Sequence, residues 1–283
     1  MILVTGGSGA LARGITAKLR ADGADVLVGT REPSALAERR VDFDAPETLP
    51  AAFSGIDVLV MISAGYAEDD VVYARHRAAV EAAEAAGVGH VVYTSLIGAG
   101  DHLSIAAPHR YTERLLAAAG LDATILRNGL YAELFAPQAQ GASATGELAL
   151  AWGSGGLRPV VRDDLAEAAA IVAREIDAAR AAGGPSPHAG LTYELDGTEY
   201  VTGLNLAAAL TEAAGRPVAY SDPGLAGTRE ALAGYGLLPY QAAHTVSILS
   251  NVQAGLLDRT DTALPKLLGR EPRSPFALLA AQG

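Results

Sequence analysis

A glycine-rich turn at residues 6–9, Gly-Gly-Ser-Gly, holds the first groups of the chain with recognisable chemistry. Gly6 would let the backbone turn sharply, and Gly9 would let backbone N–H groups approach a phosphate at a helix N-terminus, where the helix dipole favours negative charge. Ala12 is small enough for close packing of a helix on a strand. The turn therefore favours a dinucleotide pyrophosphate as ligand. Its expected contacts are Gly6, Ser8, Gly9, Ala10 and Leu11.

The elements on either side of this turn support its interpretation as a ligand-binding turn. Residues 2–4 form a short apolar run that is typical of a buried parallel strand. Leu11, Ile15 and Leu19 follow at helical spacing. A strand, a glycine turn and a helix in this order indicate dinucleotide binding. An ordinary glycine turn without a ligand is the alternative.

The end of a second strand, expected at residues 25–29, would meet the adenosine ribose of the dinucleotide. A carboxylate at this place favours NAD(H), whereas a basic group accommodates the 2′-phosphate of NADP(H). The first charged residue here is Arg31, and we expect Pro33 to open a helix that points Glu32 away. Arg31 therefore favours NADP(H) over NAD(H). The alternative is a solvated loop arginine.

Two further strands are expected at residues 40–43 and 57–62. Asp42 and Phe43 would lie beside the adenine ring, where Asp42 could accept a hydrogen bond from the amino group. A turn formed by Asp42 and Asp44 is the alternative. The small residues that follow the fourth strand would let the cofactor backbone come close. They are Ser63, Ala64 and Gly65.

A fifth strand, expected at residues 90–95, ends in Thr94 and Ser95, which would stand at the carboxyl edge of the sheet, where ligands bind in such folds. A helix should start near Pro108. His109 and Glu113 are four residues apart on it and share a face. Glu113 could hold His109 in one tautomer, and His109 could then hydrogen-bond the nicotinamide ribose or protonate the product. An exposed His–Glu pair without a catalytic role is the alternative.

After a sixth strand, expected at residues 123–127, the alternation of strands and helices is no longer regular. Residues 137–158 read as a loop rich in Gly, Ser and Ala, in which the single tryptophan is either a pocket lid or a core anchor. Candidate pocket walls are Asn128, Tyr131, Glu133, Phe135 and Trp152.

The remaining elements complete an α/β fold. Asp163 and Asp164 should cap a helix that ends near residue 181, and Thr202 should cap another over residues 204–214. Strands are expected at residues 191–195 and 218–220, followed by three helices separated by prolines. The chain thus predicts a doubly wound parallel Rossmann sheet (residues 1–150) and a small, mostly helical C-terminal substrate lobe (residues 151–283). The lobe is interleaved with the sheet and should not fold independently.

The composition excludes several classes of function. The 283 residues carry a net charge of −11, which argues against nucleic acid or an anionic membrane surface as partner. There is no cysteine, hence no disulfide and no thiol nucleophile. No apolar run has the length of a membrane span, and Met1 leads directly into the first strand, so we expect no signal peptide and a cytoplasmic location. No clustered His/Asp ligand set and no serine nucleophile elbow occur, so neither a metal site nor a serine hydrolase is expected.

The chain resembles the NmrA-like group of atypical short-chain dehydrogenase/reductases in five stretches: residues 4–12, 92–95, 109–113, 126–133 and 266–272. Within this group it looks most like the NADPH-dependent quinone reductases and the triphenylmethane dye reductases. The resemblance implies a Rossmann fold, NADP(H) and a small flat acceptor. It also favours Ser95, His109 and Glu113 as catalytic residues.

One departure from the wider superfamily is informative. Typical members use a tyrosine as acid and a lysine four residues later, but His109 stands at the lysine position here and Ile105 at the tyrosine position. Reduction of a ketone normally needs a positioned acid worth about 10²–10⁴-fold in rate. A quinone or a cationic dye accepts hydride into a far less basic product. The missing pair therefore favours a quinone-type acceptor. Tyr111, two residues from His109, should point to a different side of the helix.

The sequence thus predicts an NADPH-dependent oxidoreductase that transfers hydride to a quinone or similar conjugated aromatic acceptor. Two alternatives remain open: an NADP(H)-sensing regulator without turnover, and a tailoring reductase that acts on a polycyclic aromatic or enone metabolite. A homodimer is an expectation from the wider superfamily.

Overall fold

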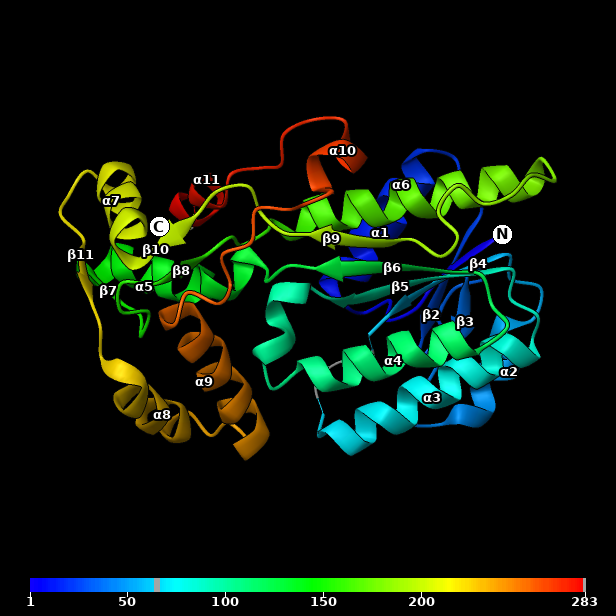
Figure 1. Cartoon of the computed structure of the whole chain (residues 1–283), viewed down its shortest axis with the longest axis horizontal. Helices are drawn as coiled ribbons and strands as arrows, with labels where there is room; N and C mark the ends of the chain where they lie inside the picture. Colours follow the sequence, from blue (N-terminus) through cyan, green and yellow to red (C-terminus); the bar gives the residue numbers. More distant parts are fainter. Residues whose placement is uncertain (64–66, 282–283) are drawn as a thin grey trace.

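The computed structural model describes residues 1–63 and 67–281. Figure 1 shows two parts, a sheet covered by helices on both faces and, at the end of the sheet opposite the N-terminus, a lobe of helices and short strands. In the described part of the chain, no helix is long and apolar enough to cross a membrane.

A seven-stranded parallel sheet has the strand order β3-β2-β1-β4-β5-β6-β9. Its strands are β1 (Ile2–Val4), β2 (Val26–Thr30), β3 (Glu38–Arg40), β4 (Val58–Ile62), β5 (His90–Leu96), β6 (Ala123–Asn128) and β9 (Thr192–Leu195). In register, Ile2 of β1 lies opposite Val26 of β2 and Val58 of β4. The order reverses between β1 and β4, and ligands bind at such a switch point, beyond the carboxyl ends of the strands. The expected doubly wound parallel sheet is confirmed.

Both faces of the sheet are covered because its strands are apolar on both faces. Ile2 and Val4 of β1 belong to one buried cluster and Leu3 to another, as the alternation of side chains along a strand requires. Figure 1 shows one group of helices above the sheet and another below it. The upper group is α1 (Ala10–Ala21), α6 (Arg162–Ala181) and α10 (Leu264–Leu268), and the lower group is α2 (Leu49–Phe53), α3 (Asp69–Ala85) and α4 (Ala106–Ala118).

The lobe has a third buried cluster, centred on Trp152. Its helices are α5 (Ala136–Thr145), α7 (Gly203–Ala214), α8 (Gly224–Gly234), α9 (Pro239–Gln253) and α11 (Pro275–Ala280). Its strands form two small sheets, β7 (Glu147–Ala149) with β11 (Ala219–Ser221), and β8 (Gly156–Leu157) with β10 (Val201–Thr202). Three short 3₁₀ turns complete the fold: η1 (Pro46–Thr48), η2 (Gly98–His102) and η3 (Ala132–Phe135).

The parts of the chain before and after residue 150 both contribute to both halves of the molecule. Helix α6 and strand β9 come after it and belong to the sheet half, whereas α5 and β7 come before it and pack in the lobe. Asp164 of α6, which is fully buried, accepts hydrogen bonds from Arg270 at 2.7 Å and from the backbone N–H of Arg273 at 2.6 Å. The late segment is thereby anchored to the sheet half before it ends in the lobe.

Several expected boundaries are wrong near β3. The third strand covers Glu38–Arg40 instead of residues 40–43, and Pro33 opens no helix. A carboxylate oxygen of Glu38 accepts hydrogen bonds from the backbone N–H groups of Ser34 (2.6 Å) and Ala35 (3.2 Å). This compact turn replaces the expected helix.

The second half of the chain holds more regular structure than its sequence suggested. The expected loop at residues 137–158 contains α5 and β7, because alanine-rich segments favour helix even without an apolar stripe, and Ala139 and Ala142 are buried. Four helices, not three, follow β11. Asp163 and Asp164 lie in the first turn of α6, whose N-cap is Val161, so they are not its caps.

Candidate functional site

The glycine turn after β1 leaves the N-terminus of α1 without a side-chain cap. Gly6 has φ +69°, a conformation that favours glycine, and a Cβ on Gly7 would collide with the side chain of Val28. The N-cap, Gly9, has no side chain, and the first turn of α1 has no acidic residue. First-turn N–H groups of a helix have no partner within the helix. This geometry fits a phosphate, as the sequence predicted.

A polar pocket of about 220 Å³ lies beside this turn. Six of the predicted cofactor residues line it: Gly6, Ser8, Arg31, Asp42, Phe43 and Ser63. Asp42 also accepts a hydrogen bond from the backbone N–H of Asp44 at 3.1 Å, so the turn that was the alternative is present in the same pocket.

No feature of the sequence pointed to Arg75, which reaches this pocket from α3. It forms a two-point ion pair with Asp44, at 2.7 Å and 2.8 Å. The hydrogen bond from Arg75 lowers the pKa of Asp44 below its ordinary value. Two arginines, Arg31 and Arg75, therefore place positive charge in the polar pocket, although one of them is paired.

A larger central pocket of about 300 Å³ adjoins the polar pocket, and Ile62 and Ser63 line both. It lies beyond the carboxyl ends of β4, β5 and β6, with the lobe on its other side. The predicted residues that line it are Ser63, Thr94, Ser95, His109, Asn128 and Tyr131. Leu134, His244 and Ile248 line it from η3 and α9.

The remaining predicted site residues lie elsewhere or are not described. Gly9, Ala10 and Leu11 form the start of α1 and line neither pocket. Ala64 and Gly65 lie outside the described residues. The expectation that Phe135 and Trp152 form walls of the central pocket is wrong.

Phe135 and Trp152 instead pack in the core of the lobe. Trp152 is fully buried, and its ring meets the ring of Phe135 edge to face with centroids 4.9 Å apart. A large aromatic side chain lowers the free energy of the fold most when its whole surface leaves water. Glu133, also expected as a pocket wall, accepts a hydrogen bond from the backbone N–H of Arg162 at the start of α6 (3.1 Å).

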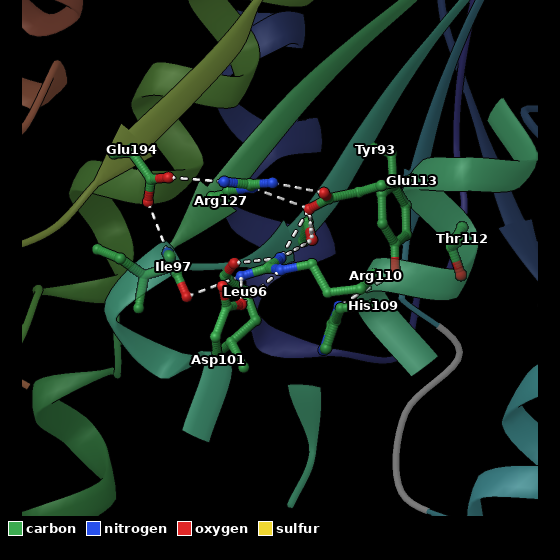
Figure 2. Close-up of polar contacts among 12 residues, drawn as sticks. Tyr93, Leu96, Ile97, Asp101, His109, Arg110, Thr112, Glu113, Arg127 and Glu194 are labelled. Atoms are coloured by element: carbon green, nitrogen blue, oxygen red, sulfur yellow. Dashed lines mark hydrogen bonds and ion pairs between the residues drawn. The ribbon is translucent and has the colours of Figure 1, made fainter. Parts of the chain in front are cut away.

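A charged network lies beside the central pocket and comprises Ser95, Arg110, Glu113, Arg127 and Glu194. Figure 2 shows its four charged members. Glu113 accepts hydrogen bonds from Ser95 at 2.6 Å, Arg110 at 2.7 Å and Arg127 at 2.7 Å. Arg127 also donates to Glu194 at 2.9 Å. Burial raises the pKa of Glu113, but its hydrogen bonds outweigh burial, so its pKa lies below the ordinary value. Hydrogen bonding to Glu113 likewise raises the pKa of Arg127.

The charged network extends to the η2 turn. Arg110 donates to Asp101 at 2.6 Å and to the carbonyl oxygens of Leu96 and Ile97 at 2.8 Å and 3.0 Å. The backbone N–H of Gly98 donates to Glu194 at 2.7 Å. The network thus ties together the ends of β5, β6 and β9 and the turn after β5, and it fixes the floor of the central pocket.

The expectation that Glu113 holds the tautomer of His109 is wrong, because Glu113 faces the arginines. The ring of His109 instead meets the hydroxyl of Tyr93 through Nδ1 at 3.1 Å. Burial, with a smaller contribution from the positive charge of Arg110, lowers the pKa of His109 to about 4. Burial also raises the pKa of Tyr93. Both side chains are therefore neutral near pH 7. As expected, Tyr111 points elsewhere and accepts a hydrogen bond from Arg77 at 2.8 Å.

A neutral chain of hydrogen-bonding side chains continues from His109 through Tyr93, Thr112 and His76 to Ser63. The hydroxyl of Thr112 donates to the carbonyl oxygen of Pro108 at 2.8 Å, so the 2.6 Å contact with His76 Nδ1 must use the proton of His76. Burial lowers the pKa of His76 to about 3, which keeps its Nε2 free of a proton. That atom accepts a hydrogen bond from Ser63 at 3.4 Å.

Sequence reasoning missed all three interior members of this neutral chain: Tyr93, Thr112 and His76. The sequence suggested no role for His76 or Thr112, and Tyr93 was part of a strand motif with no assigned role. The hydroxyl of Tyr93 also lies within hydrogen-bonding reach of Thr112 and Ser63. Their shared burial could not be deduced from spacing, because they come from α3, α4 and β5.

Comparison with known proteins decides the family. A family model described as NAD(P)H-binding matches residues 6–175. The chain belongs to this family. It is 34% identical to Quinone oxidoreductase 2 of Escherichia coli K12 over 95% of this chain and 94% of the relative. It is 28% identical to the NAD(P)H azoreductase of Xenophilus azovorans over 97% and 95% of the two chains.

Solved structures agree with this family assignment. The NADPH complex of the Escherichia coli quinone oxidoreductase has a TM-score of 0.88 at 29% identity and 99% coverage of both chains. The NADP(H) complex of Citrobacter triphenylmethane reductase has a TM-score of 0.88 at 25% identity and full coverage of both chains. The expected NmrA-like atypical short-chain dehydrogenase/reductase is confirmed, and so is an NAD(P)H-dependent oxidoreductase.

The residues present fit an NAD(P)H molecule that extends across both pockets. The uncapped start of α1 and the two arginines suit the phosphates, and Ile62 and Ser63 join the polar pocket to the central one. At the wall of the central pocket, the Oδ1 atom of Asn128 is buried and has no hydrogen-bond partner among the described residues. It is an acceptor left for a ligand. Within the same residues, no group of three or more His, Asp or Glu side chains is arranged to hold a metal ion.

Proposed function

We propose that the protein transfers hydride from NADPH to a quinone or a similar conjugated aromatic acceptor. The observation that carries this proposal is the junction of the two pockets at Ile62 and Ser63. A dinucleotide that lies across this junction leaves its reactive ring in a central pocket whose walls are mostly apolar and include no Tyr–Lys pair. The relatives named for quinones, azo compounds and triphenylmethane dyes support an acceptor with delocalised electrons.

Bound NADPH would supply the hydride, that is, two electrons and one proton. The chain supplies a shaped, largely dry pocket and a neutral imidazole at its wall. Because the pKa of His109 is about 4, the imidazole acts near pH 7 as a hydrogen-bonding group that orients the acceptor. A quinone needs no positioned acid, since its reduced oxygen is weakly basic and can take the remaining proton from water. Positioning is then the main contribution of the protein.

The preference for NADPH over NADH rests on Arg31. Its guanidinium stands in the polar pocket near the Asp44–Arg75 pair, and a basic group at the end of β2 accommodates a 2′-phosphate. We expect Arg31→Gln to weaken NADPH binding about tenfold and to leave NADH binding within about twofold, since a charge-assisted hydrogen bond is worth about 1.5 kcal/mol. Titration calorimetry with both cofactors measures the difference.

Steady-state oxidation of NADPH, followed by its absorbance against enzyme-free blanks, tests the reaction with a small panel of quinones. His109→Ala should lower kcat/KM at least tenfold, whereas His102→Ala, at an exposed position, serves as the matched control. Turnover of quinones by the protein and its loss in the His109 variant would support the proposal. If NADPH binds but no quinone reacts faster than in the blank, the proposal fails. An NADP(H)-sensing regulator or a tailoring reductase for a polycyclic enone would then become the leading assignment.

A further inference from the structure

A second cavity of about 180 Å³, the lobe cavity, lies inside the C-terminal lobe. It is lined by residues of η3, α5, β7, α8 and α9 and is partly open to solvent. Its main apolar walls are Phe135, Leu150, Leu232 and Leu249, together with Leu134 and Ile248. Neither the cofactor contacts nor the catalytic residues described above use it.

The lining of the lobe cavity offers little to a polar ligand. It contains no Asp, Glu, Lys, Arg or His side chain. Two of its polar members, Thr228 and Thr245, donate their hydroxyl protons to the carbonyl oxygens of Gly224 and Gln241 in their own helices, each at 2.9 Å. Such local bonds satisfy the donors. The third, Gln138, is exposed. An apolar lining of this kind favours apolar guests.

The lobe cavity adjoins the central pocket. Leu134 of η3 and Ile248 of α9 line both. Leu134 is 49% exposed, so its side chain is not locked in a core, and Ile248 is half-buried. These two side chains are the partition between the site of hydride transfer and the lobe cavity. A group attached to an acceptor ring in the central pocket could therefore pass between them.

We propose that the lobe cavity is a subsite for a hydrocarbon substituent of the acceptor, an inference that rests on the proposed function. The ring of an alkyl-substituted quinone would stay beside His109 while its chain passes Leu134 and Ile248 into the lobe. An apolar cavity of about 150 Å³ accommodates a benzene molecule, so this one fits a chain of roughly six carbons. Each methylene removed from water improves binding about threefold to fourfold.

Kinetics with paired acceptors test the subsite. Two benzoquinones that differ only in a methyl or a hexyl substituent have nearly the same ring chemistry. We expect the hexyl compound to have a kcat/KM at least tenfold higher, mainly through a lower KM. Thr245→Leu fills the cavity from α9 and should abolish this preference while the methyl compound reacts as before. Ala243→Leu, on an exposed position of the same helix, is the matched control.

A binding signal that needs no turnover separates the subsite from the reaction. Trp152 is the single tryptophan of the chain, and its edge-to-face partner Phe135 lines the lobe cavity. Titration with 1-hexanol, without cofactor, should therefore change tryptophan fluorescence in a saturable way. The change should disappear in Thr245→Leu and persist in Ala243→Leu.

The outcomes distinguish the two proposals. A saturable hexanol signal that Thr245→Leu removes, together with no quinone turnover, would retain the subsite and reject the quinone reaction. Quinone turnover with equal kcat/KM for both substituents and no hexanol signal would reject the subsite alone. A hexyl preference that survives in Thr245→Leu would also overturn it, because the chain would then lie elsewhere.

Discussion

Two polar assemblies start from adjacent residues of α4 and differ in charge. The charged network gathers Arg110 and Glu113 with two further ionised side chains from β6 and β9. The neutral chain gathers His109 and Thr112 with Tyr93 and His76, and burial keeps its two histidines uncharged. Residues adjacent in sequence thus enter opposite electrostatic environments, because successive positions on a helix face different directions.

The difference in charge between the two assemblies indicates that they have different roles. Ionised groups that compensate one another hold strand ends in place, and Ser95 is the member of the charged network that lines the central pocket. The neutral chain reaches the same pocket at Ser63 and His109 without bringing charge to it. Of these two assemblies, an acceptor ring therefore meets hydrogen-bonding groups but no ion, while the half-buried Asp69 of α3 brings a carboxyl group to the same pocket. The charged network should govern stability, and the neutral chain should govern turnover.

The largest effect should follow from removing the central carboxylate of the charged network. Glu113→Gln keeps the size of the side chain but leaves Arg110 and Arg127 without their shared counter-charge. Breaking a buried ion pair costs about 3–5 kcal/mol, and the partial exposure of these groups favours the lower end, about 3 kcal/mol. Urea unfolding near pH 7 measures the loss.

An exposed ion pair supplies the control for Glu113→Gln. Arg174 pairs with Asp22 at 2.9 Å, and both side chains are 45% exposed. Because exposed pairs contribute little, Arg174→Gln should cost less than about 1 kcal/mol. Equal losses in the two variants would show that the charged network is not the stability element inferred here.

Lowering the pH should reduce the stability of the protein through His76, a buried member of the neutral chain. In the folded protein the pKa of His76 is about 3, whereas in the unfolded chain it is about 6.5. As the pH falls below 6.5, only the unfolded state gains this proton, so the free energy of unfolding decreases until the pH reaches the folded pKa. Between pH 6.5 and 4.5 this one group should remove about 2 kcal/mol of stability.

The matched variant for this acid effect is His76→Gln. It should be less stable than the parent protein at pH 6.5, because it loses hydrogen bonds, but its further loss down to pH 4.5 should be smaller by about 2 kcal/mol. His102→Gln, at an exposed position, should leave the slope of stability against pH unchanged. Parallel slopes for His76→Gln and the parent protein would contradict a neutral buried His76.

The two assemblies also show how far the sequence could lead. The glycine turn, Arg31 and the polar ends of β5 were predictable, since one strand–turn–helix unit and its neighbours determine their places. His109 was predictable as a pocket residue. Its partner was not: i, i+4 spacing suggested Glu113, but two arginines compete for that carboxylate, and one of them, Arg127, comes from a different strand.

The lobe was harder to predict for a related reason. Its elements are short, and their burial depends on packing among segments far apart in the chain. From the sequence, Trp152 could equally be a pocket lid or a core anchor, because it lies in a glycine-rich stretch. Its contact with the ring of Phe135 and its place in the buried cluster of the lobe identify it as a core residue. Local composition also concealed α5, because alanine, serine and glycine give no apolar period.

A smaller effect should follow from cutting the link between Tyr93 and His109. Tyr93→Phe keeps the buried ring but removes the hydroxyl that contacts Nδ1 of His109 at 3.1 Å. One hydrogen bond contributes about 1 kcal/mol, so we expect kcat/KM for a quinone to fall about fivefold with the Kd for NADPH unchanged. Stopped-flow hydride transfer and cofactor titration measure the two quantities. An equal weakening of NADPH binding would assign Tyr93 to the fold of the pocket and not to the orientation of His109.

The smallest effect concerns pH near neutrality, where neither assembly should change its charge. The pKa of His109 is about 4 and that of Glu113 lies below its ordinary value, so both keep one form from pH 6 to pH 8. His244 is the other imidazole that lines the central pocket, and its Nδ1 lies 2.7 Å from the hydroxyl of Ser104. In His244→Gln, kcat/KM should therefore vary less than about twofold over this interval and should fall only as the pH approaches 4. An inflection near pH ~6.5 that persists in this variant would mean that His109 takes up a proton in the usual range. The imidazole would then be a proton donor, and the separation between a charged network and a neutral chain would not hold at the site of hydride transfer.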